Sequence, residues 1–318
     1  MRSVGMMLPR HVPPADIVAV ARACEDAGFD EVWVVEDCFF SGGLASAAIA
    51  LSATSTITVG IGILPAVVRN PAFAAMEAAT LAGAFPDRLH LGMGHGVGDW
   101  MQQVGAKPAS WLTSLEETTV AVRDLLHGRS VTTAGDYVQL DAVQLEFPPE
   151  QPPLTSLGVR GPKSVSLAGR VADGLILAEP TSTAYIAAAR ANLEEQHHRT
   201  GSTTPARLTA YSWAGLGTGS DDALRGLVAG AIRSGASDAH AAGLGEVARQ
   251  HWDAVKRGQD VRNDLLDRVV LHGDDHALRA GVVARHEAGA DCVVLVSTQS
   301  EPDHLMREIR QFGAAVAS

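Results

Sequence analysis

The stretch from residue 57 to residue 96 constrains the fold most strongly, because it combines two short apolar runs with one helix-forming segment. The apolar runs are Ile57–Ile61 and Arg88–Gly92, and the alanine-rich segment Ala72–Ala84 lies between them. Short buried strands on either side of a helix are typical of a βαβ unit, in which the two strands run parallel. The sequence therefore predicts a parallel sheet whose faces are covered by helices.

The same alternation of strand and helix recurs along the chain. Eight strands are predicted, at Val4–Leu8, Glu31–Val35, Ile57–Ile61, Arg88–Gly92, Leu154–Val159, Gly174–Ala178, Leu208–Gly217 and Asp291–Ser297. Helices are predicted at Ala15–Ala27, Leu44–Thr54, Ala72–Ala84, Ser114–His127, Pro162–Val171, Thr183–Arg199 and Pro302–Val316, with a small β excursion at Val131–Phe147. Eight strands separated by helices indicate an α/β protein with a (β/α)8 TIM barrel rather than an open doubly wound sheet.

Residues Ser220–Arg268 fit this alternation least well. Their pattern is helical, and the segment is longer than one barrel helix, so we interpret it as a helical insertion after strand seven. No proline- or serine-rich linker and no change of composition divides the chain. We therefore predict a single domain over residues 1–318.

The composition argues against several classes of function. With 46% hydrophobic and 19% charged residues, the chain is typical of a soluble globular protein. The net charge of -11 argues against nucleic acid or an acidic membrane surface as a partner, and no apolar run is long enough to span a membrane. The three cysteines are far apart and no signal peptide is visible, so we predict a cytoplasmic protein.

In such a barrel, functional residues lie at the carboxyl ends of the strands. The candidates at these positions are Glu36 and Asp37 after strand two, Gly62, Ile63 and Leu64 after strand three, Gly92, Gly94 and His95 around the end of strand four, Val159, Arg160, Gly161, Pro162 and Lys163 after strand five, and Glu179 after strand six. The glycines would let the backbone approach a flat or phosphorylated ligand closely. No set of histidine, cysteine and carboxylate residues has the spacing of a metal site.

The segment after strand five carries a physical signal for an anion. Gly161, Lys163 and Ser164 lie at the N-terminus of a predicted helix, where free N–H groups and the helix dipole favour a phosphate group. The alternative interpretation is that Arg160 and Lys163 are charges of a solvated loop.

Two stretches resemble the bacterial-luciferase-like superfamily. The first has VGIGILP at a strand end, then RNP at a helix start and DRLHLGMG at the next strand end. The second is Gly158–Leu177, GVRGPKSVSLAGRVADGLIL, which is most similar to the deazaflavin-dependent branch. The resemblance covers nearly the whole chain. It implies a (β/α)8 barrel that binds coenzyme F420, or alternatively FMN, with a small-molecule substrate and a homodimer as the usual state.

The resemblance also implies a non-proline cis peptide bond at Gly62–Ile63, which would support the back of the isoalloxazine or deazaflavin ring. An ordinary trans turn, made easy by Gly62, is the alternative. Trp100, Trp111 and Trp213 are candidates for the wall of a substrate pocket above that ring.

Strand two departs from the pattern of the superfamily, whose members often end it with Asp-His or Glu-His. Here the pair is Glu36-Asp37, and either carboxylate is a candidate acid, base or substrate anchor if a cleft raises its pKa. Otherwise Asp37 would be a loop carboxylate that holds backbone N–H groups. His95 stands where some relatives place an acidic proton donor, and its titration range suits proton transfer. The chain has 12 histidines, however, and most lie in helical surface patterns.

These features together predict an F420-dependent reductase or dehydrogenase, which would pass a hydride between the deazaflavin and a small organic substrate. An FMN-dependent monooxygenase of the same superfamily is the first alternative. A non-catalytic flavin-binding protein is the second, because the strand-two histidine is missing.

Overall fold

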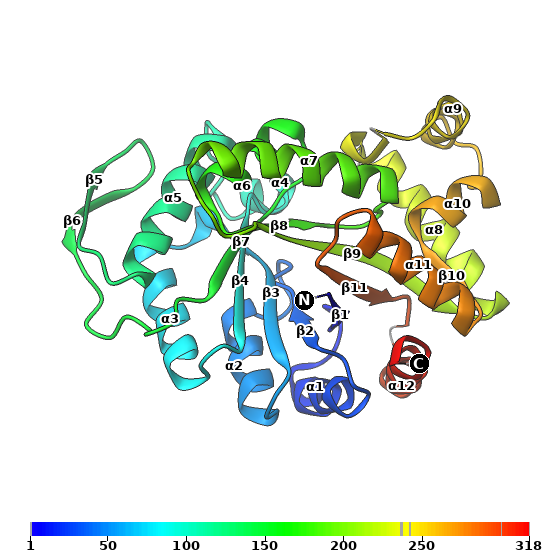
Figure 1. Cartoon of the computed structure of the whole chain (residues 1–318), viewed down its shortest axis with the longest axis horizontal. Coiled ribbons are helices and arrows are strands. Elements are labelled where there is room, and N and C mark those ends of the chain that lie inside the picture. Colours follow the sequence, from blue (N-terminus) through cyan, green and yellow to red (C-terminus); the bar gives the residue numbers. More distant parts are fainter. Residues whose placement is uncertain (1, 236–237, 242, 300, 318) are drawn as a thin grey trace.

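Parallel strands close into a barrel, as the sequence predicts. The computed structural model describes residues 2–235, 238–241, 243–299 and 301–317, and within them eight strands form the closed barrel. These strands are β1 (Ser3–Met7), β2 (Glu31–Val34), β3 (Thr58–Pro65), β4 (Leu89–Gly94), β7 (Leu154–Gly158), β8 (Gly174–Leu177), β9 (Arg207–Leu216) and β11 (Cys292–Ser297). The barrel closes because β1 pairs with both β2 and β11, while β9 pairs with both β8 and β11 (Figure 1).

Helices cover the outside of this barrel. The helices that follow barrel strands are α1 (Ile17–Asp26), α2 (Gly43–Ala53), α3 (Pro71–Ala84), α5 (Trp111–Leu126), α6 (Pro162–Val171), α7 (Thr183–Arg199), α11 (Asp275–Glu287) and α12 (Pro302–Ala317). Short 3-10 turns are η1 (Pro14–Asp16), η2 (Ala66–Val68), η3 (Thr218–Ser220) and η4 (Asp238–Ala241). Within the described ranges, no helix is long and apolar enough to cross a membrane.

Further elements lie outside the basic alternation. They are α4 (Gly98–Gln103), the antiparallel hairpin of β5 (Val131–Ala134) and β6 (Gln139–Val143), the helices α8 (Asp221–Arg233), α9 (Glu246–Lys256) and α10 (Asn263–Val269), and β10 (Leu271–Gly273). The hairpin projects on the left of Figure 1, and α8 to α10 lie on its right. The hairpin confirms the predicted β excursion, and α8 to α10 confirm the predicted helical insertion, of which residues 236, 237 and 242 lie outside the described part of the chain.

Continuous apolar runs form the barrel strands because both of their faces are covered. Every residue of β2, β4 and β11 is buried, which is the pattern expected for parallel strands between an interior and a ring of helices. The helices α2 and α3 meet the barrel through small side chains, including Ala47, Ala50, Ala75 and Ala78, all fully buried. Alanine at these positions lets each helix approach the sheet closely.

A polar cluster fills the amino-terminal half of the barrel interior. The buried Glu31 forms an ion pair with Arg207, and its carboxylate also accepts hydrogen bonds from Ser3 Oγ at 2.6 Å and Trp33 Nε1 at 2.9 Å. His90 Nε2 lies 2.7 Å from a serine hydroxyl of β7, and burial lowers the pKa of His90 to about 3. Glu31, Ser3, Trp33 and Arg207 thus form one bonded cluster, in which Arg207 Nε has no partner among the described residues, and the carboxyl ends of the strands form the other end of the interior.

A bulge in β3 shapes that other end. Ile61 pairs with Leu91 and Leu64 pairs with Met93, so β3 has one residue more than β4 between these pairs. The peptide bond Gly62–Ile63 within the bulge is cis, which confirms the expectation from the family resemblance. The bulge also explains why β3 runs to Pro65 instead of ending at Ile61.

Glycines of the neighbouring strands make room for Ile63. A Cβ atom on Gly158 would lie 2.3 Å from Ile63 Cγ2, and one on Gly94 would lie 3.0 Å from Ile63 Cδ1. A Cβ atom on Gly92 would lie 2.2 Å from the carbonyl oxygen of Ile61. Gly92 and Gly94 lie within β4 rather than in a turn after it. Because neither residue has a side chain, the bulge of β3 fits against β4.

The structure corrects three parts of the predicted outline. The loop expected before α5 contains the short helix α4. No helix or strand was predicted between residues 269 and 290, but the structure has β10 and the complete barrel helix α11 there. Several strand ends differ by one or two residues, as for β9, which begins at Arg207 instead of Leu208. The three-residue β10 is too short to show any periodicity, and charged residues in α11 interrupt its apolar pattern.

Replacing Gly92 with alanine tests the close approach of β3 and β4. The added Cβ would meet a backbone oxygen, which cannot move without distorting the strand, so we expect the free energy of unfolding to fall by about 3 kcal/mol. Gly226→Ala is the control, because this exposed glycine of α8 has open space around it and alanine favours a helix by roughly 0.5–1 kcal/mol. Urea unfolding measures both, and an unchanged midpoint for Gly92→Ala would contradict the packing described.

Candidate active site

The candidate site is a cavity of about 720 Å³ at the carboxyl ends of the barrel strands. Predicted residues that line it are Glu36, Asp37, Gly62, Ile63, His95, Val159, Arg160, Gly161 and Glu179. Predicted residues that do not line it are Leu64, Gly92, Gly94, Pro162 and Lys163. Trp100 and Trp213 also line the cavity, whereas Trp111 lies behind its wall, with its ring centre 5.9 Å from that of His95.

The N-terminus of α6 forms one end of this cavity. Gly161 is the N-cap, where no side chain caps the helix N–H groups, and Pro162 occupies the first helical position. The first N–H to bond within the helix is that of Val165, which donates to the Gly161 carbonyl, so the N–H groups of Lys163 and Ser164 have no intrahelical acceptor. Such free donors, together with the helix dipole, favour an anion.

Arg160 adds a cation beside these N–H groups. Its side chain lines the cavity, its buried Nε has no hydrogen-bond partner, and no ion pair involves its guanidinium among the described residues. The Arg160 backbone is fixed, because Tyr185 Oη donates a hydrogen bond of 2.6 Å to its carbonyl oxygen. This end of the cavity therefore combines a positive charge and free N–H donors without an anion from the described part of the chain.

The insertion packs behind the same end, against Tyr185. His240 of η4 is buried, and its ring centre lies 4.4 Å from that of Tyr185. Burial, with a further contribution from the nearby Arg160 cation, lowers the pKa of His240 to about 3. His240 is therefore neutral at neutral pH and packs as a flat wall between the insertion and the Arg160 loop.

His95 lies between the anion end and the tryptophan side of the cavity. Its Nε2 is 3.5 Å from Ser164 Oγ, and its buried Nδ1 has no partner among the described residues. Burial lowers the pKa of His95, so the neutral imidazole dominates at neutral pH. In this form His95 can donate or accept one hydrogen bond, but it carries no charge.

Glu36 is held by its neighbours. Its carboxylate forms a two-pronged ion pair with Arg69, with 2.8 Å between Oε2 and Nη2, and also accepts a bond of 2.7 Å from the Gly43 N–H. Both oxygens are thus engaged, and the arrangement joins the end of β2 to the N-terminus of α2 and the start of α3. Asp37 pairs with Arg10 at 3.1 Å near the rim, where the Arg10 guanidinium lies 5.1 Å from the centre of the Phe40 ring.

Glu179 differs from both of these carboxylates. It is half-buried at the end of β8, lines the cavity and forms no ion pair within the described residues. Burial raises the pKa of its carboxyl, and the Asp37 carboxylate raises it further. A hydrogen bond from its own backbone N–H and the Arg160 cation act in the opposite direction. The peptide bond that follows, Glu179–Pro180, is cis.

Tyr211 is a lining residue that the sequence analysis did not select. It is 3% exposed, and its hydroxyl oxygen would lie 2.2 Å from a Cβ on Gly62 and has no partner among the described residues. The sequence does contain a signal for it, because Tyr211 and the selected Trp213 are two residues apart on one strand. Alternation along a strand places both side chains on the same face.

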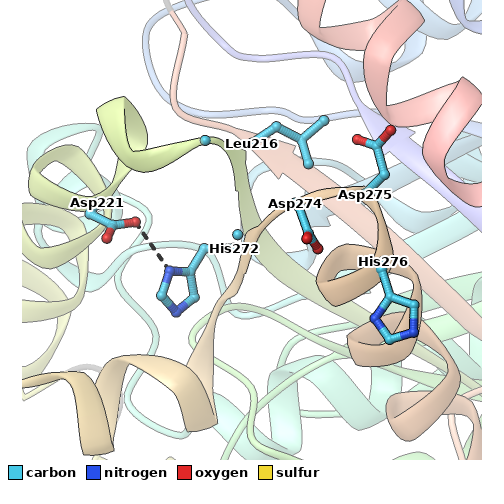
Figure 2. A pocket seen from close by; sticks show the side chains of 8 residues that line it. Leu216, Asp221, His272, Asp274, Asp275 and His276 are labelled. Carbon is cyan, nitrogen blue, oxygen red and sulfur yellow. Dashed lines mark hydrogen bonds and ion pairs between the residues drawn. The ribbon is translucent and has the colours of Figure 1, made fainter.

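A second cavity, of about 760 Å³, lies beside the ends of β9 and β10 (Figure 2). Its lining residues are Leu216, Gly217, Asp221, His272, Gly273, Asp274, Asp275 and His276. His272 is bonded on both ring nitrogens, at 3.1 Å to Asp221 and 2.8 Å to Asp267. Among the described residues no group of three or more histidine, cysteine or carboxylate side chains is placed to hold a metal ion. We take the barrel mouth as the site, because its polar groups are the unpaired ones.

The fold and this site define a TIM-barrel protein with a cavity suited to an anionic ligand at the carboxyl ends of its strands. The chain belongs to the luciferase-like monooxygenase family, whose model matches residues 1–292. It is 28% identical over 165 residues to 5,10-methylenetetrahydromethanopterin reductase of Methanolobus tindarius, which is 52% of this chain and 50% of the relative. It is 30% identical over 178 residues to F420-dependent glucose-6-phosphate dehydrogenase of Nakamurella multipartita, which is 51% of this chain and 52% of the relative.

These alignments span about half the length of the curated relatives. The structural likeness extends further. An F420-dependent secondary alcohol dehydrogenase in complex with an F420-acetone adduct superimposes with a TM-score of 0.82 over 99% of both chains, at 21% sequence identity. This likeness supports the barrel fold over the whole described chain.

Replacing Arg69 with methionine tests whether Glu36 is a structural residue. Because the pair is partly exposed, with 27% and 11% of the two side chains accessible, we expect a loss of roughly 1–3 kcal/mol in the free energy of unfolding, less than for a fully buried pair. The double variant Arg69→Met/Glu36→Leu should recover part of this loss, because no carboxylate is then left without its cation. Thermal and urea unfolding measure the change, and a single variant as stable as wild type would refute this role.

Proposed function

We propose that this protein is a coenzyme F420-dependent oxidoreductase that transfers a hydride between the deazaflavin and a small organic substrate. The observation that carries the proposal is the unpaired cation and free N–H pair at one end of the cavity. Arg160 and the N-terminus of α6 offer a phosphate site that no residue of the described chain fills. The remaining wall is largely apolar and suits a flat ring.

The residues present fit such a cofactor. Its phosphate would lie against the N–H groups of Lys163 and Ser164 and the Arg160 guanidinium. The ring would lie against Ile63, which the glycines of β4 and β7 allow to approach the mouth. When bound, the deazaflavin supplies the hydride chemistry, and the chain orients the two reactants and excludes water. Trp100, Trp213 and the insertion would form the water-excluding walls.

The relatives favour F420 over FMN. One of the two curated relatives described is F420-dependent by name, and so is the solved structure. The family as a whole is named for monooxygenases, which keeps an FMN-dependent monooxygenase as the alternative. A non-catalytic flavin-binding protein would share the same site and differ by turning over no substrate.

Equilibrium binding of F420 and FMN, each followed by its own fluorescence, tests this proposal. We expect tight binding of F420 and binding of FMN at least tenfold weaker. Arg160→Ala should weaken F420 binding by about tenfold or more, as expected for the loss of a charge-assisted contact of roughly 1.5–3 kcal/mol.

Lys163→Ala separates the side chain from the backbone of the same residue. Lys163 does not line the cavity, so its backbone N–H should suffice and the variant should bind F420 within about threefold of wild type. Arg170→Ala, at the other end of α6, is the matched control for the loss of one positive charge. Preference for FMN would move the function to the monooxygenase, and binding of neither cofactor would end the cofactor assignment.

We also propose that two copies of the chain form a homodimer through α3. Phe73 and Met76 are 62% and 48% exposed, and their spacing of three residues places them on one face of that helix. Val68, 40% exposed, precedes them in η2. An exposed apolar face of this kind is suited to a partner surface.

Light scattering on a sizing column tests the dimer. Wild type should have twice the chain mass of 33.2 kDa, and Phe73→Asp should shift the population to that of the single chain. Phe147→Asp is the control, because Phe147 is 84% exposed but lies beyond the β5–β6 hairpin. A wild-type protein that runs as a single chain at micromolar concentration would refute the dimer.

A cytoplasmic location remains part of the proposal and is suited by Cys24 and Cys292, both free and buried.

A further inference from the structure

The carboxylates of the cavity wall differ in how they are paired. Glu36 is engaged on both oxygens by Arg69 and the Gly43 N–H, so it cannot readily exchange a proton with a ligand. Asp37 pairs with Arg10 at the rim. Among the described lining residues, Glu179 is the carboxylate without a cation bound to it. It is therefore the acid of this cavity that is free to exchange a proton with a ligand.

The surroundings of Glu179 support this reading from each side. Burial has the largest effect on its pKa and raises it. Of the charged groups nearby, Arg160 at the end of β7 lowers this pKa and Asp37 at the end of β2 raises it. Tyr211 on β9 is close enough for Glu179 to raise the pKa of its hydroxyl, after the larger effect of burial. The other titratable groups of the described wall are His95, His11, Arg10 and Glu36, and His11 bonds to the Gln299 carbonyl at 3.1 Å.

A buried hydroxyl marks the same corner as a place where a ligand completes the hydrogen bonding. Tyr211 Oη lines the cavity beside the Gly62 backbone and has no partner within the described chain. Buried hydroxyls without any partner are rare in folded proteins, so a bound group or a water molecule is expected here. Glu179 and Tyr211 thus form a polar corner beside the apolar side chains of Ile63, Ile176 and Trp213.

We propose that Glu179 is the catalytic proton donor and acceptor of this site, and that the substrate it serves is a carbonyl compound or the corresponding alcohol. The inference rests on the proposed function, because it needs the hydride carrier named there. It assigns the role of proton donor to the end of β8. Family members often carry a histidine at the end of β2, and this chain lacks that histidine.

The chemistry balances in atoms and electrons. In the direction of reduction, the substrate carbonyl carbon gains a hydride, which leaves the reduced deazaflavin oxidised by two electrons. The electron pair of the C=O π bond moves to oxygen, which takes the proton of the Glu179 carboxyl as its O–H bond breaks. The Glu179 carboxylate then recovers a proton from solvent. In the direction of oxidation, the carboxylate would accept the hydroxyl proton while the hydride of the C–H bond passes to the oxidised deazaflavin.

A carbonyl group suits the corner because its oxygen gains negative charge as the hydride arrives. A protonated carboxyl placed at that oxygen stabilises the charge and ends by transferring its proton. The apolar wall formed by Ile63, Ile176 and Trp213 suits an uncharged substrate of modest size. A phosphorylated substrate would instead compete for Arg160, which the cofactor needs.

Glu179→Gln keeps the size of the side chain and removes its exchangeable proton. With F420 bound and cyclohexanone as the probe, we expect kcat to fall by about a hundredfold or more, with F420 affinity and cyclohexanone KM within about threefold of wild type. The wild-type kcat for reduction should fall as pH rises through the raised pKa of Glu179, because the protonated form is required. The kcat for oxidation of cyclohexanol should rise over the same range, and both limbs should vanish in Glu179→Gln.

Glu308→Gln is the matched control. Glu308 on α12 is a buried acid whose pKa is likewise raised by burial, but it does not line the cavity, and its carboxyl accepts a hydrogen bond from the lining residue Ser297. This variant should keep the wild-type kcat and pH profile. It therefore separates the loss of any buried acid from the loss of the one that faces the substrate.

Infrared difference spectroscopy on the cofactor-free protein gives a readout that does not depend on turnover. A C=O stretch of a protonated carboxyl should disappear as pH rises above the ordinary carboxyl range, be missing from Glu179→Gln and persist in Glu308→Gln. Absence of such a Glu179 band at pH 6 would overturn the proposal, since the residue would then have no proton to give.

The remaining outcomes separate this inference from the proposed function. If wild type binds F420 and reduces cyclohexanone but Glu179→Gln does so equally well, the inference falls and the function stands. If wild type binds F420 but reduces no ketone or aldehyde in a panel of cyclohexanone, acetone and benzaldehyde, the substrate class is wrong. If wild type binds no F420, both the function and the inference fall.

Discussion

Ile63 lies against the backbones of two neighbouring strands, and this contact determines the shape of the barrel mouth. It needs three glycines, Gly92, Gly94 and Gly158, because a Cβ atom at any of them would collide with the bulge of β3 or the strand beside it. The extra residue in β3 then turns the Ile63 side chain to the cavity, where it forms an apolar wall. These glycines therefore act on a ligand indirectly. They make room for Ile63, and Ile63 is the residue that would contact the ligand.

The distribution of paired and unpaired polar groups divides the barrel into two functional halves. At the amino-terminal end, Glu31 and Arg207 form an ion pair that joins β2 to β9 across the barrel interior. At the carboxyl end, Arg160 and Glu179 remain without ion-pair partners within the described chain. Burial of unpaired polar groups costs stability, so their presence in one cavity is more readily explained by binding than by folding. Arg160 suits an anion, and Glu179 suits an exchangeable proton.

The sequence predicted the framework because its signals are local. The bounds predicted for α6 and α7 agree with the structure, in which a proline occupies the first position of α6 and a serine caps α7. The rule that parallel strands end at one edge also placed most candidate residues around one cavity. The three-residue strand β10 carried no periodic signal, and α11 was missed with it.

Pairing within the site was harder to predict, because it depends on residues that are distant in sequence. Glu36 meets Arg69, 33 positions away, and only the folded chain shows that this carboxylate is engaged. Tyr211 and Glu179 come from two neighbouring strands, β9 and β8, and the pairing of Ala210 with Leu177 brings them to one corner. The roles of Glu36, Asp37 and His95 as acids or bases therefore could not be ranked from their positions alone.

A crystal structure of the protein with F420 tests the central claim most directly, because the claim is about where a phosphate and a flat ring lie. The account predicts phosphate density within hydrogen-bond distance of the Lys163 and Ser164 N–H groups and the Arg160 guanidinium, with the ring against Ile63. A phosphate bound elsewhere, with Arg160 left unpaired, would contradict it.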